Sequence, residues 1–298
     1  MSPLDQLWQN KLPQARVPLI AVEPYSAVTL TALSDLAAEG LIRPVLLGDR
    51  VKIRQALSAL SHAESLLSGQ IIDSERPMED AAVLISHYPD SALMKGDIHS
   101  DVFLRGIVAA KLVKPGRLMS HLAVFETNEK RPLFITDPSI FINPDVAQRI
   151  KITANAIDTL QRLGYDEIRV AVLSSVETAS ESIPSSMEAR AIAAHFANLE
   201  RIFVDGPLSL DLAVSAEAAR TKASRSEVAG RADVLVVPNL DAGNMLCKGL
   251  NFLAAMPSAN LIAGTVCPVV FSSRAAGREE RKQTIRLALS GRRDTLRA

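Results

Sequence analysis

The sequence has few cysteines, and its charges cancel. Cys247 and Cys267 are the only cysteines in 298 residues, too few for a disulfide framework, and no CxxC pair is present to hold zinc. The 33 basic and 33 acidic residues give a net charge of zero, which argues against a nucleic-acid-binding protein. Because 48% of the residues are hydrophobic, the chain is expected to fold rather than to be disordered.

Long hydrophobic runs are also missing. No apolar stretch approaches the roughly 20 residues that span a bilayer, and the most apolar one, 261–271, contains Gly264 and Pro268. The first ten residues, MSPLDQLWQN, lack the apolar core of a secretory signal. We therefore expect a cytoplasmic protein that binds neither membranes nor nucleic acid.

Several familiar motifs do not occur. There is no GxGxxG, GxxxxGK[ST], HExxH or GxSxG motif. The sequence therefore gives no sign of a dinucleotide-binding site, a P-loop, a zinc-protease site or a serine-hydrolase site, respectively. The five histidines are scattered, and we expect no metal site. No internal repeat and no linker rich in proline, glycine or serine marks a domain boundary.

Short runs of valine, isoleucine and leucine alternate with amphipathic segments. The runs lack polar alternation, as expected for strands covered on both faces. The candidate strands are 18–22, 44–47, 118–125, 132–136, 168–173, 201–204, 234–237 and 261–263, and the candidate helices are 27–39, 51–60, 101–112, 145–163, 187–196, 211–222, 243–255 and 278–289. A polar loop at 127–131 can close a hairpin. This order predicts an α/β fold with a mainly parallel sheet, and the length suggests two domains.

A first polar cluster is LMKGDIHS, residues 93–100, which leads into a helix. His99 and Ser100 lie at the start of that helix, where free backbone N–H groups favour an anion. Arg105 follows just over one turn later, and its guanidinium suits contact with phosphate. The alternative is an ordinary capped helix with a surface arginine.

A second cluster follows the buried strand in ADVLVVPNLDAGNML, residues 232–246. Asp241 and Asn244 come after the carboxyl end of this strand, where open α/β sheets bind ligands. The alternative for Asp241 is a helix cap.

In a third cluster the strand 268–271 ends in Ser272, Ser273 and Arg274. Glu279 and Glu280 fall in the first turn of the next helix, so a hydroxyl, a guanidinium and a carboxylate can converge. The alternative is that these acids only stabilise the helix N-terminus. Residues 274–298 carry eight basic and three acidic residues, which fits either a solvated helix face or a site for a phosphate-bearing ligand.

These clusters, in this order, resemble the phosphate acetyltransferase and phosphate butyryltransferase family over about residues 18–289. The resemblance is carried by VVPNLDAGNMLCKGLNFLA (236–254), LMKGDIHSDVFLR (93–105), SHLAVFE (120–126), ITDPSIFINPD (135–145), VAVLSSVE (170–177), DGPLSLDLAVS (205–215) and SSRA (272–275). It implies an enzyme that interconverts acyl-CoA and phosphate with acyl phosphate and CoA. CoA is then a substrate, and no cofactor is expected.

The resemblance also implies the architecture. It predicts two α/β domains with a cleft between them, similar to isocitrate and isopropylmalate dehydrogenases, and a homodimer. By analogy, the first domain comprises residues 1–117 and 265–298, and the second comprises residues 118–264.

Individual roles follow from the same resemblance. The implied residues are Ser273, Arg274, Glu280 and Glu279 for catalysis, Arg105, Ser100 and Arg274 for phosphate, and His99, Asp241 and Asn244 for the substrate cleft. The family's catalytic aspartate falls at Glu280 by spacing, but Glu279 is also an acid, so the choice of base stays open.

Three departures from the family pattern favour the butyryl-type branch. Glu280 replaces an aspartate, Ala275 stands where many acetyltransferases have glycine, and Asn239 stands where aspartate is common. Two other functions stay open: a non-catalytic regulatory module that binds CoA esters, and a metal-dependent decarboxylating dehydrogenase of the same fold. The dehydrogenase would need clustered aspartates and a nucleotide site, and neither is evident.

Overall fold

The computed structural model describes residues 2–8, 11–60, 67 and 70–290. The chain divides into two compact units. The central unit comprises Met1–Leu7 and Leu118–Ser258, and the flanking unit comprises Trp8–Arg117 and Ala259–Ala298.

The boundary after Ser258 lies before the position expected from the resemblance, residue 264. The reason is the pairing of strand β10 (Ser258–Ala263) with β11 (Val269–Val270). The two strands run antiparallel, with Leu261 opposite Val270, and β11 in turn pairs with β4 (Ala92–Lys95) of the flanking unit.

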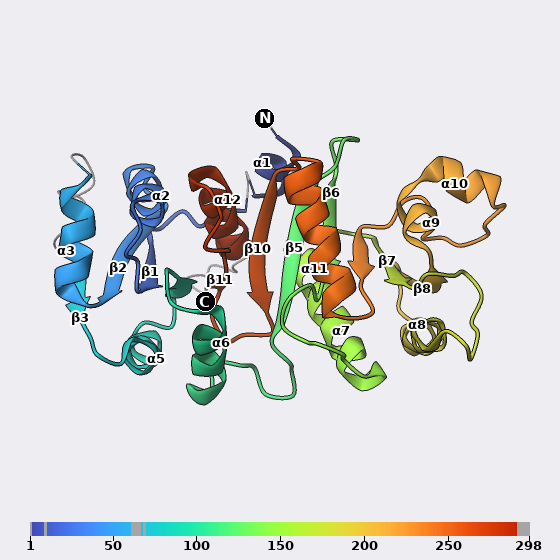
Figure 1. The fold of residues 1–298 in the computed structure, drawn as a ribbon, viewed down its shortest axis with the longest axis horizontal. Coiled ribbons are helices and arrows are strands. Elements are labelled where there is room, and N and C mark those ends of the chain that lie inside the picture. Colours follow the sequence, from blue (N-terminus) through green and yellow to red (C-terminus); the bar gives the residue numbers. More distant parts are fainter. Residues whose placement is uncertain (1, 9–10, 61–66, 68–69, 291–298) are drawn as a thin grey trace. The chain divides into compact units, whose positions relative to one another are not determined.

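The flanking unit is built on a mainly parallel sheet. In it, β1 (Val17–Val22) lies between β2 (Ile42–Gly48) and β4, and β2 also pairs with β3 (Ile71–Asp73). All of these pairs are parallel, as is the pair of β4 with β11. Figure 1 shows helices on both sides of these strands. These helices are α2 (Ala27–Ala38), α3 (Arg50–Ser58) and α12 (Arg278–Leu289) on one side, and α5 (Pro77–His87) and α6 (Ser100–Ala109) on the other.

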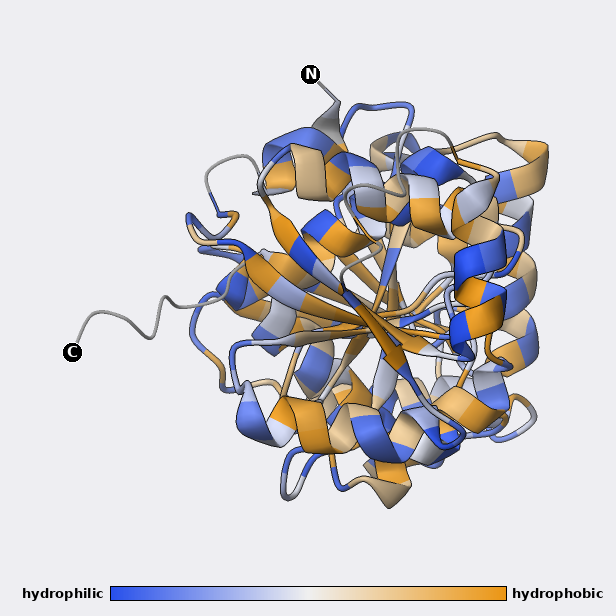
Figure 2. Ribbon diagram, turned by 90° about the vertical axis from the view of Figure 1, so that its left-hand side faces the viewer, coloured by the Kyte–Doolittle hydropathy of each residue, from blue (hydrophilic) through white to orange (hydrophobic). Residues whose placement is uncertain are grey.

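The core of the flanking unit joins the sheet to α2 and α12. Leu19 and Ala21 of β1 belong to the same buried cluster as Leu30 and Leu33 of α2 and Ile285 of α12, and all five are fully buried. Figure 2 shows the strands mostly in the hydrophobic colour and the helices in mixed colours. The burial of both faces explains why the strands lack polar alternation.

The strands of the central unit form one series of paired neighbours. It begins with a hairpin of β5 (Ser120–Glu126) and β6 (Pro132–Thr136), and it continues in parallel through β9 (Val234–Val236), β7 (Ile168–Leu173) and β8 (Ile202–Leu208). Its helices are α7 (Val146–Arg162), α8 (Pro184–His195), α9 (Leu210–Val214), α10 (Ala216–Thr221) and α11 (Leu240–Lys248), and α1 (Pro3–Trp8) lies at the start of the chain.

The structure confirms the α/β fold with mainly parallel strands. Each of the candidate strands corresponds to an observed strand, and the hairpin at 127–131 is closed by a hydrogen bond from the Thr127 N–H to the Arg131 carbonyl. The prediction missed β3, β4, α1 and α5. The predicted helix 211–222 is two helices, because Ser215 ends α9 and caps α10 with its side chain. Among the described residues, no helix is both long and apolar enough to cross a membrane.

Candidate active site

The first and third polar clusters meet at one edge of the flanking sheet. Strands β4 and β11 are parallel neighbours, with Met94 opposite Val270. The segments that follow them, Gly96–Asp97 and Ser272–Arg274, therefore leave the sheet at the same edge. The carboxyl edge of a parallel sheet is where α/β proteins bind ligands.

Gly96 allows the turn after β4 to approach β1 closely. Its N–H donates to the Val22 carbonyl at 2.9 Å, and a Cβ at this position would lie 2.4 Å from the same oxygen. The next residue, Asp97, accepts hydrogen bonds of 2.8 Å from the backbone N–H groups of Tyr25 and Ser26, just before α2. The turn is thereby fixed to two neighbouring elements.

A buried arginine on α12 supports the Ser273–Arg274 turn. The Arg281 side chain is 1% exposed, and its Nη2 donates to the carbonyl oxygens of Ser273 at 3.2 Å and Arg274 at 3.3 Å. The side chains of Ser273 and Arg274 are exposed. The turn therefore presents a hydroxyl and a guanidinium to solvent while its backbone is held from the inside.

Glu280 directly precedes Arg281 in the first turn of α12. Its side chain is half-buried, and Oε1 accepts a 3.3 Å hydrogen bond from Asn260 Nδ2. Burial raises the pKa of the Glu280 carboxyl above its usual range, and the charge of Arg281 opposes this shift. A carboxylate with a raised pKa is a better proton acceptor.

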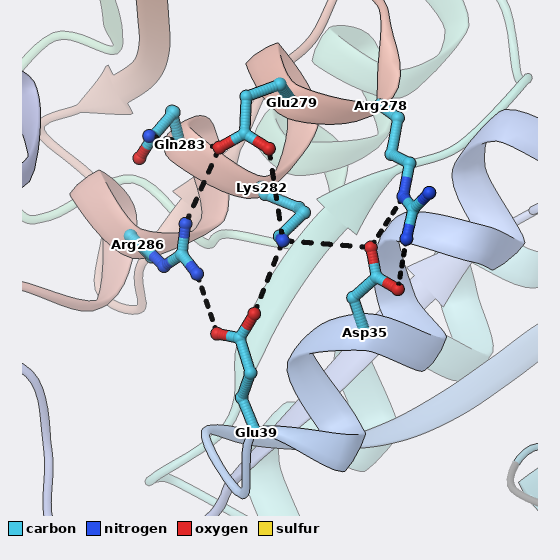
Figure 3. A network of polar contacts seen from close by, with 7 residues as sticks. All are labelled: Asp35, Glu39, Arg278, Glu279, Lys282, Gln283 and Arg286. Carbon is cyan, nitrogen blue, oxygen red and sulfur yellow. Dashed lines mark hydrogen bonds and ion pairs between the residues drawn. The ribbon is translucent and has the colours of Figure 1, made fainter.

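Glu279 has different surroundings, which Figure 3 shows. Its side chain is 68% exposed and pairs with Lys282 at 3.9 Å and Arg286 at 3.8 Å. These two cations also pair with Glu39 of α2, at 3.3 Å and 2.6 Å. Glu279 thus belongs to an ion-pair network between α12 and α2.

Asp35 completes this network on α2. It accepts two hydrogen bonds of 2.7 Å from Arg278, and these bonds hold the pKa of the Asp35 carboxyl below its usual range. Of the described basic residues of α12, Arg278, Lys282 and Arg286 are paired with acids and Arg281 is buried. The basic residues Arg292, Arg293 and Arg297 lie outside the described residues.

Lys95, the last residue of β4, is a second buried cation at this edge of the sheet, besides Arg281. Its side chain is 0% exposed, and Nζ donates to the Gly96 carbonyl at 3.2 Å. Burial lowers the pKa of Lys95 to about 8; the charge of Arg281 adds to this shift and Asp97 opposes it. Neither Lys95 nor Arg281 was among the predicted site residues, because a sequence pattern does not distinguish a buried cation from a solvated one.

The first cluster has the predicted start of a helix. Helix α6 begins at Ser100, and His99 precedes it; both residues are exposed. Arg105 is also exposed, at 74%, and its Nη2 donates to Asp101 at 2.8 Å within the same helix. The structure thus places Arg105 on the surface of α6, paired with an acid one turn earlier.

The second cluster belongs to the central unit. Helix α11 begins at Leu240 and is capped by Asn239, whose side chain accepts from the Ala242 N–H at 2.9 Å. The alternative that Asp241 caps this helix is therefore wrong, and Asp241 is exposed in the first turn, with Asn244 following on the same helix. An aspartate at position 239 could accept the same hydrogen bond.

Comparisons with known proteins match most of the chain. A family model described as phosphate acetyl/butaryl transferase matches residues 75–289. A phosphate acetyltransferase of Rhizobium meliloti is 37% identical over 281 residues, covering 92% of this chain and 88% of the relative. A phosphate butyryltransferase of Clostridium acetobutylicum is 31% identical over 266 residues, covering 87% of this chain and 88% of the relative.

Solved structures agree with these matches. A branched-chain phosphotransacylase from Enterococcus faecalis superposes with a TM-score of 0.81 at 28% identity, covering 92% of this chain and 98% of the other. A 4-hydroxythreonine-4-phosphate dehydrogenase from Burkholderia phymatum has a TM-score of 0.58 at 13% identity, covering 93% and 99%, which shows a shared fold alone. By sequence and by structure, the chain belongs to the phosphate acetyl/butaryl transferase family of acyltransferases.

Proposed function

We propose that Ser273, Arg274 and Glu280 carry the transfer of an acyl group between CoA and phosphate. The observation that carries this assignment is that buried Arg281 donates hydrogen bonds to the backbone of the Ser273–Arg274 turn. The half-buried Glu280 directly precedes Arg281 on α12. In the direction of acyl-CoA synthesis, the CoA sulfur attacks the carbonyl carbon of an acyl phosphate. The bond from that carbon to the phosphate oxygen then breaks, and phosphate leaves.

Glu280 is the proposed base. A thiol with a pKa near about 8.5 is mostly protonated at neutral pH, so its proton must be removed as the carbon–sulfur bond forms. Burial already raises the pKa of Glu280, which favours proton transfer to this carboxylate. A positioned general base typically contributes about 10²–10⁴-fold in rate.

The hydroxyl and guanidinium groups have complementary roles. Ser273 orients the sulfur through a hydrogen bond, and Arg274 neutralises the phosphate and the charge that develops on the carbonyl oxygen. Arg105 and Ser100 are proposed to contact phosphate, for which Arg105 must exchange its partner Asp101. His99, Asp241 and Asn244 are proposed to contact the substrates. No covalent enzyme intermediate and no cofactor are needed, since positioning both substrates supplies much of the rate.

We propose a preference for acyl groups of the butyryl type, on the basis of Ala275 and Asn239. The identities to an acetyltransferase and a butyryltransferase, 37% and 31%, are close to each other. One methylene in a pocket is worth only about 1–3 kcal/mol. A comparison of kcat/KM for acetyl-, propionyl- and butyryl-CoA with phosphate tests the preference, and a higher value for acetyl-CoA contradicts it.

We also propose that the protein is a cytoplasmic homodimer. Large apolar side chains are exposed near the end of α11: Met245 at 69%, Phe252 at 72% and Leu253 at 90%. Exposed large apolar side chains are common in protein interfaces, and a second copy of the chain is the proposed partner here.

The central test is the variant Arg274→Ala. We expect it to lose CoA-dependent release of phosphate from acyl phosphate while its far-UV circular dichroism and melting temperature stay unchanged. Arg76→Ala is a matched control, because Arg76 is a surface residue that pairs with Glu79, and it should remain fully active. Full activity of Arg274→Ala contradicts the proposed role. Binding of acyl-CoA without turnover in the wild-type protein would favour a regulatory module instead.

A further inference from the structure

Buried donors without a partner gather behind the Ser273–Arg274 turn. Nε and Nη1 of Arg281 and Oγ of Ser272 are buried and have no hydrogen-bond partner. The Ser272 side chain is 0% exposed and that of Arg281 is 1% exposed. Lys95, also 0% exposed, offers three N–H bonds and has one observed acceptor, the Gly96 carbonyl. These side chains come from three different elements, which are the end of β4, the end of β11 and helix α12.

Such an arrangement is unfavourable unless an acceptor joins it. Buried charges in proteins are normally paired, and a buried donor without a partner costs about 1–3 kcal/mol. Here two buried cations are close enough that the charge of Arg281 lowers the pKa of Lys95. The nearby acid Asp97 directs one carboxylate oxygen at the backbone of Tyr25 and Ser26. The charges of Asp97 and Glu280 oppose that of Arg281, so what the group has in excess is buried hydrogen-bond donors without an acceptor.

We propose that Lys95, Ser272 and Arg281 form a binding site for a phosphoryl group, that of inorganic phosphate or of the acyl phosphate. This inference rests on the proposed function and adds three buried residues to the phosphate contacts proposed there. The several oxygens of a phosphoryl group can accept from a hydroxyl, an ammonium and a guanidinium together. A carboxylate has a single charge and two oxygens, so it would satisfy the group less completely.

The position of Arg281 connects this site to the proposed chemistry. One nitrogen of its guanidinium holds the backbone of Ser273 and Arg274, while the other two remain for the anion. A bound phosphoryl group would therefore lie next to the turn that carries the Ser273 hydroxyl. Arg281 would both bind phosphate and position the turn.

The experiment is a titration of inorganic phosphate by isothermal calorimetry, with CoA titrated in parallel. The variants are Lys95→Met, Ser272→Ala, Arg281→Lys and the control Arg286→Met, which removes an α12 arginine of the Glu39 ion pair. We expect the Kd for phosphate to rise at least about tenfold in Lys95→Met and Arg281→Lys, and about fivefold in Ser272→Ala. The Kd for CoA should stay within about twofold in Lys95→Met and Ser272→Ala, and the control should bind phosphate as the wild type does.

Unchanged affinity for phosphate in Ser272→Ala and Lys95→Met overturns the site, as does a loss of CoA affinity without a loss of phosphate affinity. Should Arg281→Lys not fold, Ser272→Ala still decides the question, because it removes a single buried hydroxyl. Turnover of the wild type is measured separately. If the wild type turns over normally and the variants bind phosphate with unchanged affinity, the proposed site is contradicted and the proposed function still stands. If the wild type binds phosphate at this site but shows no turnover, the proposed function is contradicted and the site still stands.

Discussion

Glu279 and Glu280 are consecutive in the sequence, but their carboxylates have different surroundings. The Glu279 carboxylate pairs with Lys282 and Arg286 at the surface, whereas the Glu280 carboxylate accepts from Asn260 and is half-buried beside Arg281. Successive residues of a helix point about 100° apart. The helix thereby assigns one acid to a structural ion-pair network and leaves the other for chemistry.

The first prediction concerns the choice of base. Glu280→Gln should lower kcat by about 10²–10⁴-fold, because the thiol proton then has no acceptor. Glu279→Gln, its matched control, should stay within about twofold. The measurement is thiol release from acyl-CoA in the presence of phosphate, across a range of pH. A loss of turnover in Glu279→Gln alone would contradict the assignment.

The second prediction concerns Gly96. Gly96→Ala should destabilise the protein by about 1–3 kcal/mol, since its Cβ would lie 2.4 Å from a backbone oxygen that cannot move cheaply. Gly249→Ala is the control: no atom lies within 4 Å of the added carbon, and the backbone there is helical. Urea unfolding of both variants measures the difference, and equal stabilities would show that the turn after β4 can relax.

The third prediction concerns acid stability. Hydrogen bonds from Arg278 keep the pKa of Asp35 in the folded protein below its value in the unfolded chain. The stability that Asp35 contributes is therefore fully present above about pH 4 and is lost as the pH falls through the folded-state pKa. Asp35→Asn should cost about 1 kcal/mol at pH 7, and the difference should shrink towards pH 2.

The control for this prediction is Glu227→Gln. Glu227 pairs with Arg231 on the surface, with exposures of 64% and 54%, so its loss should cost less than about 0.5 kcal/mol. Urea unfolding at several pH values provides both measurements. A difference between Asp35→Asn and the wild type that does not depend on pH would exclude the Asp35 charge as its cause.

The fourth prediction concerns the exposed apolar residues near the end of α11. Phe252→Glu should convert the proposed dimer to a monomer, because a charge in an apolar interface is left without a partner. Val83→Glu is the control, since Val83 is also exposed, at 54%, but lies on α5 of the flanking unit. Sedimentation velocity distinguishes the two outcomes, and a dimer that survives Phe252→Glu rules out this surface.

The sequence by itself determined the order of strands and helices and the segments that carry the chemistry. Buried parallel strands need continuous apolar runs, and helices need an apolar stripe, so both leave a periodicity that can be recognised. The short strands Ile71–Asp73 and Ala92–Lys95 were missed, because three or four residues are too few to establish a period. The prediction that Ser273 and Arg274 emerge at the carboxyl end of a strand followed from their place directly after an apolar run.

Only the tertiary structure decided which charges are buried and which are paired. In the sequence, Arg281 is one of eight basic residues near the C-terminus and Lys95 is a lysine before a glycine, and nothing marks either as inaccessible to water. Their burial results from the packing of α12 and β4 within one unit. The same packing separates Glu279 from Glu280. Burial and pairing depend on contacts between residues far apart in the chain, and those contacts exist only in the folded molecule.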